Sequence, residues 1–496
     1  MARSRTLALI LLMHVAFDEG PLRAQQTGPA LREEALHTLR KAAAFFRGEV
    51  ASHGGYVYYY SLDLRRRWGE GEASPDTIFV QPPGTPNVGM AYLKAHAATG
   101  DRVFLDAARE AAEALVAGQL ESGGWTQAVH FGQSGRKERY RKGKGGNRNN
   151  SSLDDGQTQV ALQMLARADL ALNLQHAGIR DAALYGFEAL LKAQFPNGAF
   201  PQVWTGPVRP KAVVRARFPD YDWKTEGKIK NYWDQYTLND GLAGTVSDTL
   251  IAAHQVYKDE RYKAALGKLG DFLILAQMPD PQPGWCQQYN DEMVPIWARK
   301  FEPPAVTGWE SQDVMETLIK ISRYTGEKKY LEPIPRALEY LKKSLLPDGR
   351  IARYLEFKTN RPLYMDAKYQ LTYDASSAPS HYGWTQAARL DQIAKAYRDA
   401  GGGSLDAGPA PARPARESEE IVRRIIRDLD GEGRWISTYA DERLVGEPKF
   451  APAFRYLSSD VFARNVEALS EYVARPRNTS RPARTTADSK RPPGAG

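Results

Sequence analysis

The apolar residues of this chain recur with helical spacing, and the clearest example lies between residues 262 and 277. Its apolar positions are Ala265, Leu266, Leu269, Phe272, Leu273 and Leu275. Because residues three and four positions apart share one face of a helix, this pattern predicts an amphipathic helix with one buried face. The same pattern predicts helices at residues 105–120, 182–193 and 331–345. Each is preceded by a tight turn and another expected helix, and these earlier helices begin near residues 87, 155, 240, 311 and 381.

A short strip of shared composition follows each pair of helices. The first residue of each strip is small, except for one arginine, and the second is aromatic or apolar. The residue two positions after the second one is polar. The strips begin at Gly55-Tyr56, Gly124-Trp125, Ala199-Phe200, Gly284-Trp285 and Arg350-Ile351. Repeated helix pairs bury their inner helices against one another. We therefore expect an all-α protein, an α/α toroid with short return strips at one rim, and the irregular spacing favours a closed ring over an open solenoid.

The two ends of the chain differ in composition from the rest. Arg3 and Arg5 precede an apolar run and a small residue at Ala24, which predicts a secretory signal peptide and a secreted or periplasmic protein. Residues 401–416 contain GGGS and PAPARPAR, typical of a linker or a long loop. The expected organisation is a signal peptide at 1–24, the toroid at 25–400, the linker, a helical segment at 417–474 that completes or packs on the toroid, and a disordered tail at 475–496.

Composition narrows the class of partner. The chain has 496 residues, 42% of them hydrophobic, which is enough for a large core. Its single cysteine, Cys286, allows no intrachain disulfide. The net charge of +8 favours an anionic partner, but charge alone does not choose between nucleic acid, an acidic polysaccharide and an anionic surface. Beyond the signal, no stretch is apolar and long enough to span a bilayer, so no membrane partner is expected.

Two similar acidic stretches stand where inner helices are expected to begin. They are Leu153-Asp154-Asp155-Gly156 and Leu238-Asn239-Asp240-Gly241, and Glu310 holds the same position in the next unit. One such acid is an ordinary helix cap. Several converging acids repel one another unless a cation lies between them, so we predict a metal site formed by Asp154, Asp155, Asp240 and Glu310. Histidine and cysteine lack ligand spacing here, and an oxygen-only cluster favours Ca²⁺.

Cations and amides accompany these acids. Arg299 and Lys300 stand in PIWARKFEPP, and Arg353 and Arg361 stand in RIARYLEFKTNRP. Arg353 occupies the strip position that glutamine holds in three other strips. An acidic sugar chain suits this mixture, because arginine pairs with carboxylates in a bidentate manner, amides bind hydroxyls and aromatic rings cover sugar faces. The candidate substrate-binding residues are Arg353, Arg361, Lys300, Asn239, Gln202 and Trp125.

The order of these motifs resembles a known family. Between residues 87 and 384 the chain carries LDDGQTQ, GGW, FPQVW, the NDG entrance, ARKFEPPAVTGWES and ARYLEFKTNRP. This set resembles the all-helical pectate lyases of polysaccharide lyase family 10. The resemblance implies an α/α barrel or toroid in which residues 25–400 form the catalytic domain. It also implies calcium-assisted β-elimination of polygalacturonate, which leaves a 4,5-unsaturated uronide.

The resemblance assigns roles to individual residues and also shows departures. Arg299 falls on the proposed catalytic base of the family, although physical arguments alone rank Lys300 equally. Glu310, Arg353 and Arg361 fall on matching motif positions. Asp155 replaces an amide of the family, Gly241 stands where the family has a second acid, and Lys368 stands near the place of a further arginine.

Two other functions are compatible with the same residues. An α/α-barrel glycoside hydrolase acting on acidic or unsaturated sugars would use Asp154 and Asp240 as acid and base. A non-catalytic glycan-binding homologue would keep the groove without the chemistry. For the lyase, the expected partner is polygalacturonate, with neither nucleic acid nor membrane, and the protein is expected to be a monomer.

Overall fold

The computed structural model describes residues 28–132, 137–143, 146–209, 211–379, 382–401 and 415–475. The expected signal peptide at 1–24, most of the linker and the tail from 476 lie outside the described residues. Among the described residues, no helix combines the length and the hydropathy that a membrane span requires.

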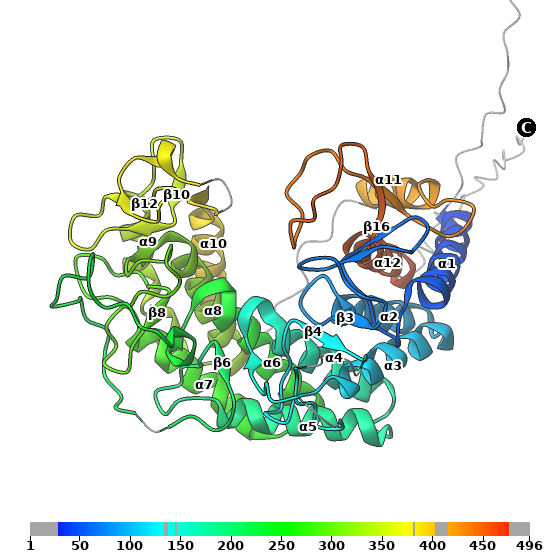
Figure 1. The fold of residues 1–496 in the computed structure, drawn as a ribbon, viewed down its shortest axis with the longest axis horizontal. Coiled ribbons are helices and arrows are strands. Elements are labelled where there is room, and N and C mark those ends of the chain that lie inside the picture. The colour runs from blue at the N-terminus through cyan, green and yellow to red at the C-terminus, as the bar shows by residue number, and fades with distance from the viewer. Residues whose placement is uncertain are drawn as a thin grey trace, which may run out of the picture.

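Twelve α-helices lie in the described part of the chain and form an arc of two layers (Figure 1). The inner layer contains α2 (Thr85–Thr99), α4 (Gln157–Ala171), α6 (Leu242–Tyr257), α8 (Gly308–Thr325), α10 (Leu390–Gly401) and α12 (Ser459–Ala474). The outer layer contains α1 (Gly28–Phe45), α3 (Arg102–Ala117), α5 (Ala177–Lys192), α7 (Glu260–Leu275), α9 (Ile334–Lys343) and α11 (Ala415–Arg427). Inner helices contact one another in the order α12, α2, α4, α6, α8, α10. The predicted helix-rich architecture of paired helices is confirmed.

The arc has the shape of a horseshoe in Figure 1, with α10 near one tip and α11 and α12 near the other. The closed ring that the repeat suggested stays a prediction, because among the described residues the extensive contacts between inner helices run from α12 through α2 to α10, and no comparable contact joins α10 to α11 or α12.

Local chemistry explains where the outer helices begin. The carboxylate of Asp101 caps α3 by accepting a hydrogen bond from the backbone N–H of Val103 at 3.1 Å. Asp259 caps α7 in the same way, through the N–H of Arg261 at 2.9 Å. Such caps satisfy backbone donors that have no partner inside the helix. The buried face of α7 carries Ala265, Leu266, Leu269, Phe272 and Leu273, as the periodicity predicted.

Short strands lie beside the helices, and they follow the return strips or precede the inner helices, with further strands in the remaining loops. These strands are β1 (Tyr59–Ser61), β2 (Arg67–Trp68), β3 (Thr77–Phe79), β4 (Ala128–His130), β5 (Ser151–Ser152), β6 (Val203–Trp204), β7 (Tyr236–Thr237), β8 (Gln288–Tyr289), β9 (Val306–Thr307), β10 (Arg350–Ala352), β11 (Tyr354–Leu355), β12 (Pro362–Met365), β13 (Leu371–Thr372), β14 (Thr385–Ala387), β15 (Ile436–Thr438) and β16 (Arg455–Ser458). They make two four-stranded sheets, β15-β16-β1-β2 and β13-β12-β11-β9, and the pairs β10-β14, β3-β4, β5-β6 and β7-β8.

The polar residue of each strip fixes the start of an inner helix. The carbonyl of Gln202 accepts a hydrogen bond from the N–H of Leu153 at 2.8 Å, just before α4. The same bond joins Gln287 to Leu238 at 2.7 Å before α6, and Arg353 to Gly308 at 3.0 Å where α8 begins. Gln202, Gln287 and Arg353 are therefore structurally equivalent, as the sequence repeat indicated.

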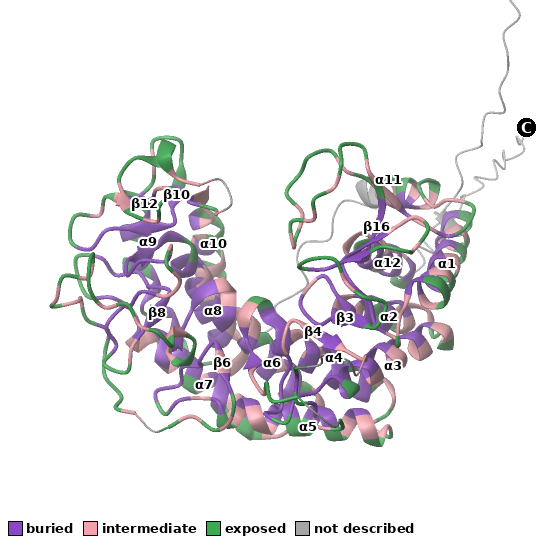
Figure 2. Cartoon of the chain, viewed as in Figure 1, coloured by how far each residue is buried: buried purple, intermediate pink, exposed green. Residues whose placement is uncertain are grey.

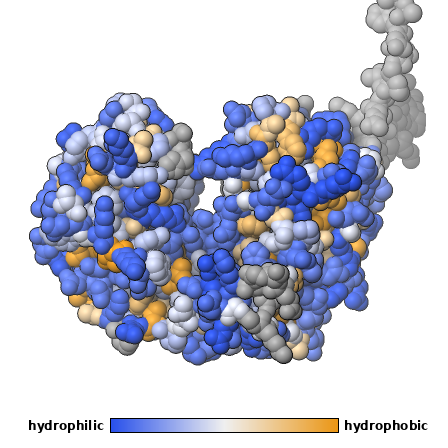
Figure 3. Space-filling model, in the orientation of Figure 1, coloured by the Kyte–Doolittle hydropathy of each residue, from blue (hydrophilic) through white to orange (hydrophobic). Residues whose placement is uncertain are grey.

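The aromatic residues of the strips belong to the core. The indole N–H of Trp125 donates to the carbonyl of Leu115 at 2.8 Å, and that of Trp285 donates to Leu273 at 2.7 Å. Trp125 has 0% exposed surface. The prediction that Trp125 contacts the substrate is wrong, because burying an indole between two helix layers removes it from any ligand. Figure 2 shows the buried residues running along the arc, and Figure 3 shows a mostly hydrophilic face with small, separate apolar groups.

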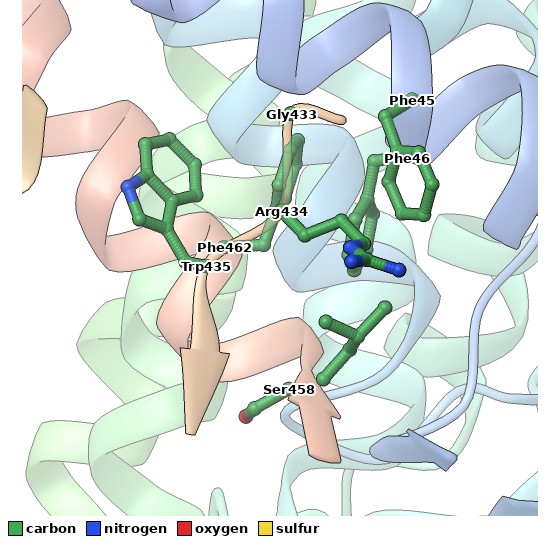
Figure 4. A pocket seen from close by; sticks show the side chains of 8 residues that line it. Phe45, Phe46, Gly433, Arg434, Trp435, Ser458 and Phe462 are labelled. Atoms are coloured by element: carbon green, nitrogen blue, oxygen red, sulfur yellow. The ribbon is translucent and has the colours of Figure 1, made fainter. Parts of the chain in front are cut away.

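The first and last segments of the described chain pack together. Phe46, in the single π-helical turn η1 (Phe46–Val50), stacks on Phe462 of α12 with ring centroids 3.9 Å apart (Figure 4). Trp435 lies 6.1 Å from the same ring. The cavity between them holds only about 10 Å³, which is at the lower limit for one water molecule. This contact ties α12 to the N-terminal helices.

Candidate active site

The two acidic stretches share one backbone conformation. Asp154–Gly156 and Asn239–Gly241 form the 3₁₀ turns η2 and η4, directly before α4 and α6. Asp155 has φ 46° and Asp240 has φ 55°, both in the left-handed region that aspartate and asparagine tolerate better than most residues. Because η2 and η4 contact each other, the same turn made twice brings both acids to one place.

Three carboxylates meet at this place. One oxygen from each of Asp154, Asp155 and Asp240 lies within 4.8 Å of the others, a spacing that could hold a metal ion. Burial and then the negative charge of Asp154 raise the pKa of Asp240 to about 8. Burial is the larger cause because it disfavours a charged carboxylate, and the nearby charge of Asp154 adds to it, although the guanidinium of Arg299 acts in the opposite direction.

Amide side chains surround the acids. The Nε2 of Gln202 donates to Asp154 Oδ1 at 2.7 Å, and the Nδ2 of Asn239 donates to Asp240 Oδ2 at 3.0 Å. The oxygens of both amides are buried without a hydrogen-bond partner among the described residues. A hard cation takes six to eight oxygen ligands, so three carboxylates with two unpaired amide oxygens beside them fit such an ion.

Arg299 lies against these acids. Its Nη2 is 3.2 Å from Asp154 Oδ1 and 3.8 Å from Asp240 Oδ2. Burial by itself lowers the pKa of this guanidinium, but the surrounding carboxylates, Glu302 first among them, outweigh burial and raise the pKa above its ordinary value. In this arrangement the guanidinium supplies the positive charge that the acid cluster lacks.

Glu302 holds the loop that carries Arg299. One carboxylate oxygen accepts the backbone N–H of Arg299 at 3.0 Å, and the other accepts the hydroxyl of Tyr382 at 3.1 Å. The backbone N–H of Glu302 in turn donates to the carbonyl of Arg299 at 2.9 Å. Glu302 is 1% exposed. A buried carboxylate with several hydrogen bonds fixes this short loop where no helix or sheet does.

The third predicted entrance, at α8, is built differently. Glu310 lies in the first turn of the helix and is fully buried. Its Oε1 accepts from Gln287 Nε2 at 2.9 Å and lies 3.7 Å from a guanidinium nitrogen of Arg353. Arg353 also lies over the ring of Tyr382, 4.2 Å from its centroid. Glu310 therefore pairs with Arg353 and lies outside the group of three acids that could share a metal ion.

Two predicted substrate-binding cations lie against aromatic rings. The ammonium of Lys300 is 4.0 Å from the ring centroid of Tyr369, and the guanidinium of Arg361 is 3.6 Å from that of Tyr373. Both side chains are exposed. Their contact with a substrate stays a prediction.

Residues near the N-terminus complete the site, and the sequence analysis missed them. Gln81 Nε2 donates to Asp155 Oδ2 at 3.2 Å and to Glu70 Oε1 at 2.8 Å. Its oxygen accepts from Gln157 Nε2 at 3.1 Å. The only sequence signal was the position of Gln81, which precedes an expected inner helix, as Asp154 does.

A polar cavity of about 400 Å³ opens onto the cluster, and we call it the acidic cavity. Its lining includes Asp154, Gln202, Arg299, Arg148 and Trp233. Gly241, where the resemblance implied a missing acid, has φ 66°, and a Cβ there would lie 3.8 Å from Asp313 Oδ2. A glycine suits this left-handed backbone, and a carboxylate from α8 already lies beside it.

Comparison with known families identifies the class of protein. A family model described as pectic acid lyase matches residues 119–327, a segment that contains the three clustered acids and Arg299. With this match the chain is identified as a lyase. The segment that resembles the pectic acid lyases covers somewhat less than half of the chain.

Solved structures with a related arrangement share little sequence with this chain. A family 10 polysaccharide lyase from Cellvibrio cellulosa, a variant in complex with trigalaturonic acid, is 19% identical, with 64% of this chain and 98% of that chain covered and a TM-score of 0.46. A D-mannose isomerase is 12% identical (90% and 98% covered, TM-score 0.44). An α-mannanase from Bacteroides thetaiotaomicron is 11% identical (91% and 96% covered, TM-score 0.40). No curated protein matches the chain.

Proposed function

We propose that this enzyme is a secreted or periplasmic, monomeric pectate lyase that cleaves polygalacturonate by calcium-assisted β-elimination. The observation that carries the proposal is the convergence of Asp154, Asp155 and Asp240 with Arg299, inside the segment that matches the pectic acid lyase family.

The residues at the cluster fit a calcium ion. Asp154, Asp155 and Asp240 would hold it, and the side-chain amides of Gln202 and Asn239 hold two of these carboxylates in place. When bound, the ion supplies positive charge beside the carboxylate of a uronate residue, where negative charge builds as the C5 proton leaves.

Arg299 is the proposed base. Arginine is normally protonated, and the carboxylates around Arg299 strengthen that tendency. When ligands balance the charge of Asp154 and Asp240, two of the carboxylates that raise this pKa are offset, and burial, which lowers the pKa, is opposed mainly by Glu302. The neutral guanidine then takes the C5 proton, the electron pair forms the C4–C5 double bond, the C4–O4 bond breaks, and the leaving oxygen takes a proton from water.

Arg353 has a supporting role in this proposal. Its guanidinium is held by Glu310 and by the ring of Tyr382, so its direction is fixed before substrate arrives. A fixed guanidinium can pair with a sugar carboxylate at little cost in side-chain entropy.

A glycoside hydrolase is the second candidate, favoured by one observation. The pKa of Asp240, raised to about 8 chiefly by burial, lets this carboxyl carry a proton at neutral pH beside Asp154, as the acid of an acid and base pair would. Their oxygens lie within 4.8 Å, which is too close for an inverting pair at about 6.5–9.5 Å and near the separation of about 5–5.5 Å in a retaining pair. The spacing therefore excludes only an inverting hydrolase, and the reaction products must separate a retaining hydrolase from the lyase.

A single assay separates the candidates. The purified protein is incubated with polygalacturonate, with Ca²⁺ or with a chelator, and both the ultraviolet absorbance of unsaturated uronide and the number of reducing ends are followed. Calcium-dependent absorbance is expected. New reducing ends without absorbance would identify a hydrolase, and neither signal would indicate a protein that only binds glycans. The Asp154→Asn variant, which keeps the shape of the side chain, should lose the calcium-dependent signal.

A further inference from the structure

A second cavity, of about 560 Å³, adjoins the acidic cavity, and we call it the distal cavity. Asn150, Val203 and Trp233 line both cavities. The segment that follows β6 contributes much of the remaining wall, through residues 205–209 and Lys211. The two cavities therefore form one elongated depression that extends well beyond the acid cluster.

Trp233 stands where the two cavities meet. It lies in the 3₁₀ turn η3 (Tyr232–Asp234), which contacts β6. Its side chain is 36% exposed, one of the few large apolar side chains at the surface. An exposed indole between two polar cavities offers an apolar face to a ligand that passes from one to the other.

The distal cavity carries positive charge. Arg209 is exposed, and the ammonium of Lys211 lies 3.7 Å from Asp291 Oδ2. The same ammonium lies over the ring of Phe195, 5.4 Å from its centroid. These contacts keep Lys211 at the wall of the cavity, whereas Asp234 is the acid among the lining residues. Arg209 and Lys211, although Asp291 also contacts Lys211, are the two groups of this lining that can pair with a carboxylate of a ligand.

We propose that the distal cavity is a subsite for a further uronate residue of the same polysaccharide chain, with its carboxylate at Lys211 and Arg209 and its ring face on Trp233. This inference rests on the proposed function, because it is the acid cluster that would bind the residue being cleaved. A polymer with one carboxylate on every sugar can place one at the acid cluster and another at these cations. Affinity and turnover should then depend on chain length.

The test compares short and long substrates. Values of kcat/KM are measured on trigalacturonate and on a galacturonate octamer for the wild type, Trp233→Ala, Lys211→Met and Lys342→Met. The last is a matched control, because Lys342 is likewise a surface lysine with one acidic partner, 3.6 Å from Asp391. For Lys211→Met we expect a loss of about tenfold on the octamer, the size of one ionic contact, and little change on the trimer. For Trp233→Ala, whose side chain also lines the acidic cavity, we expect a larger loss on the octamer than on the trimer.

Each outcome decides the proposal. A length-dependent loss in both variants, absent from Lys342→Met, supports the subsite. No loss, or an equal loss on both substrates, overturns it while leaving the lyase activity of the wild type intact. If the wild type cleaves neither substrate, the proposed function fails, and calorimetric binding of the octamer decides the subsite. Weaker binding by Lys211→Met than by Lys342→Met supports it, and absence of binding to the wild type overturns it.

Discussion

The residues at the starts of α4 and α6 and those at the start of α8 occupy equivalent positions in the repeat, yet their acidic side chains have different surroundings. At α4 and α6 a left-handed turn brings Asp155 and Asp240 together with Asp154. At α8 the helix begins directly after its strand, and Glu310 is paired with Arg353. Glu310, which is buried beside Arg353, stabilises the fold, whereas the three carboxylates that face one another are suited to bind a metal ion.

The strongest test of this contrast is the cation that stands between the acids of the first two entrances. Arg299→Lys keeps a positive charge but loses the planar fork. If Arg299 takes the C5 proton, kcat should fall by about 10²–10⁴ while KM changes little. Steady-state kinetics on polygalacturonate measure both constants, with Lys300→Arg as the control. Near-normal kcat in the first variant and its collapse in the second would transfer the base role to Lys300.

Removing the acid at α8 should damage stability. Glu310→Gln leaves the guanidinium of Arg353 buried without its carboxylate, and such a loss costs about 3–5 kcal/mol of unfolding free energy. Urea or thermal unfolding measures this cost. The matched change Asp155→Asn, at the α4 entrance, should cost far less, and equal losses for the two variants would contradict the distinction between the entrances.

The same Asp155→Asn change should act on ion binding instead. It removes one negative charge from the group of three acids while keeping the shape of the side chain. We expect calcium affinity to fall by about tenfold, because ligand charge sets affinity in oxygen-only sites. Calorimetric titration with Ca²⁺ measures the change, and an unaltered affinity would remove Asp155 from the set of ligands.

A smaller effect concerns the pH dependence of stability near α8. Burial, followed by the charge of Glu310, raises the pKa of Asp313 from 3.8 to about 6. Between these values the folded protein binds a proton that the unfolded chain has released, so this group stabilises the fold at low pH and the contribution is lost as pH rises through about 6.

The Asp313→Asn variant should therefore show a flatter decline of unfolding free energy between about pH 4 and 6 than the wild type. Denaturant unfolding at several pH values provides the comparison. Identical slopes for the two proteins would mean that Asp313 does not titrate in this range.

Much of the fold follows from local signals that the sequence carries. Apolar residues at helical spacing predicted α3 and α7, with their starts within three residues of those observed. The repeated acid before glycine predicted the convergence of Asp154 and Asp240, because equivalent positions in adjacent repeats are neighbours in space. These features depend on short-range chemistry and on a period, both of which can be seen without coordinates.

Other features were decided only by the tertiary structure. Trp125 was predicted from the sequence to bind substrate, but its side chain is packed in the hydrophobic core. Packing also put the acid of α8 beside Arg353, although its position in the repeat resembles that of the clustered acids. The exposed Trp233 and the bridging Gln81 come from segments whose neighbours are distant in sequence. Residue type and spacing determine which groups approach the rim, but which of them remain reachable depends on long-range packing, because burial is a property of the whole assembly of helices.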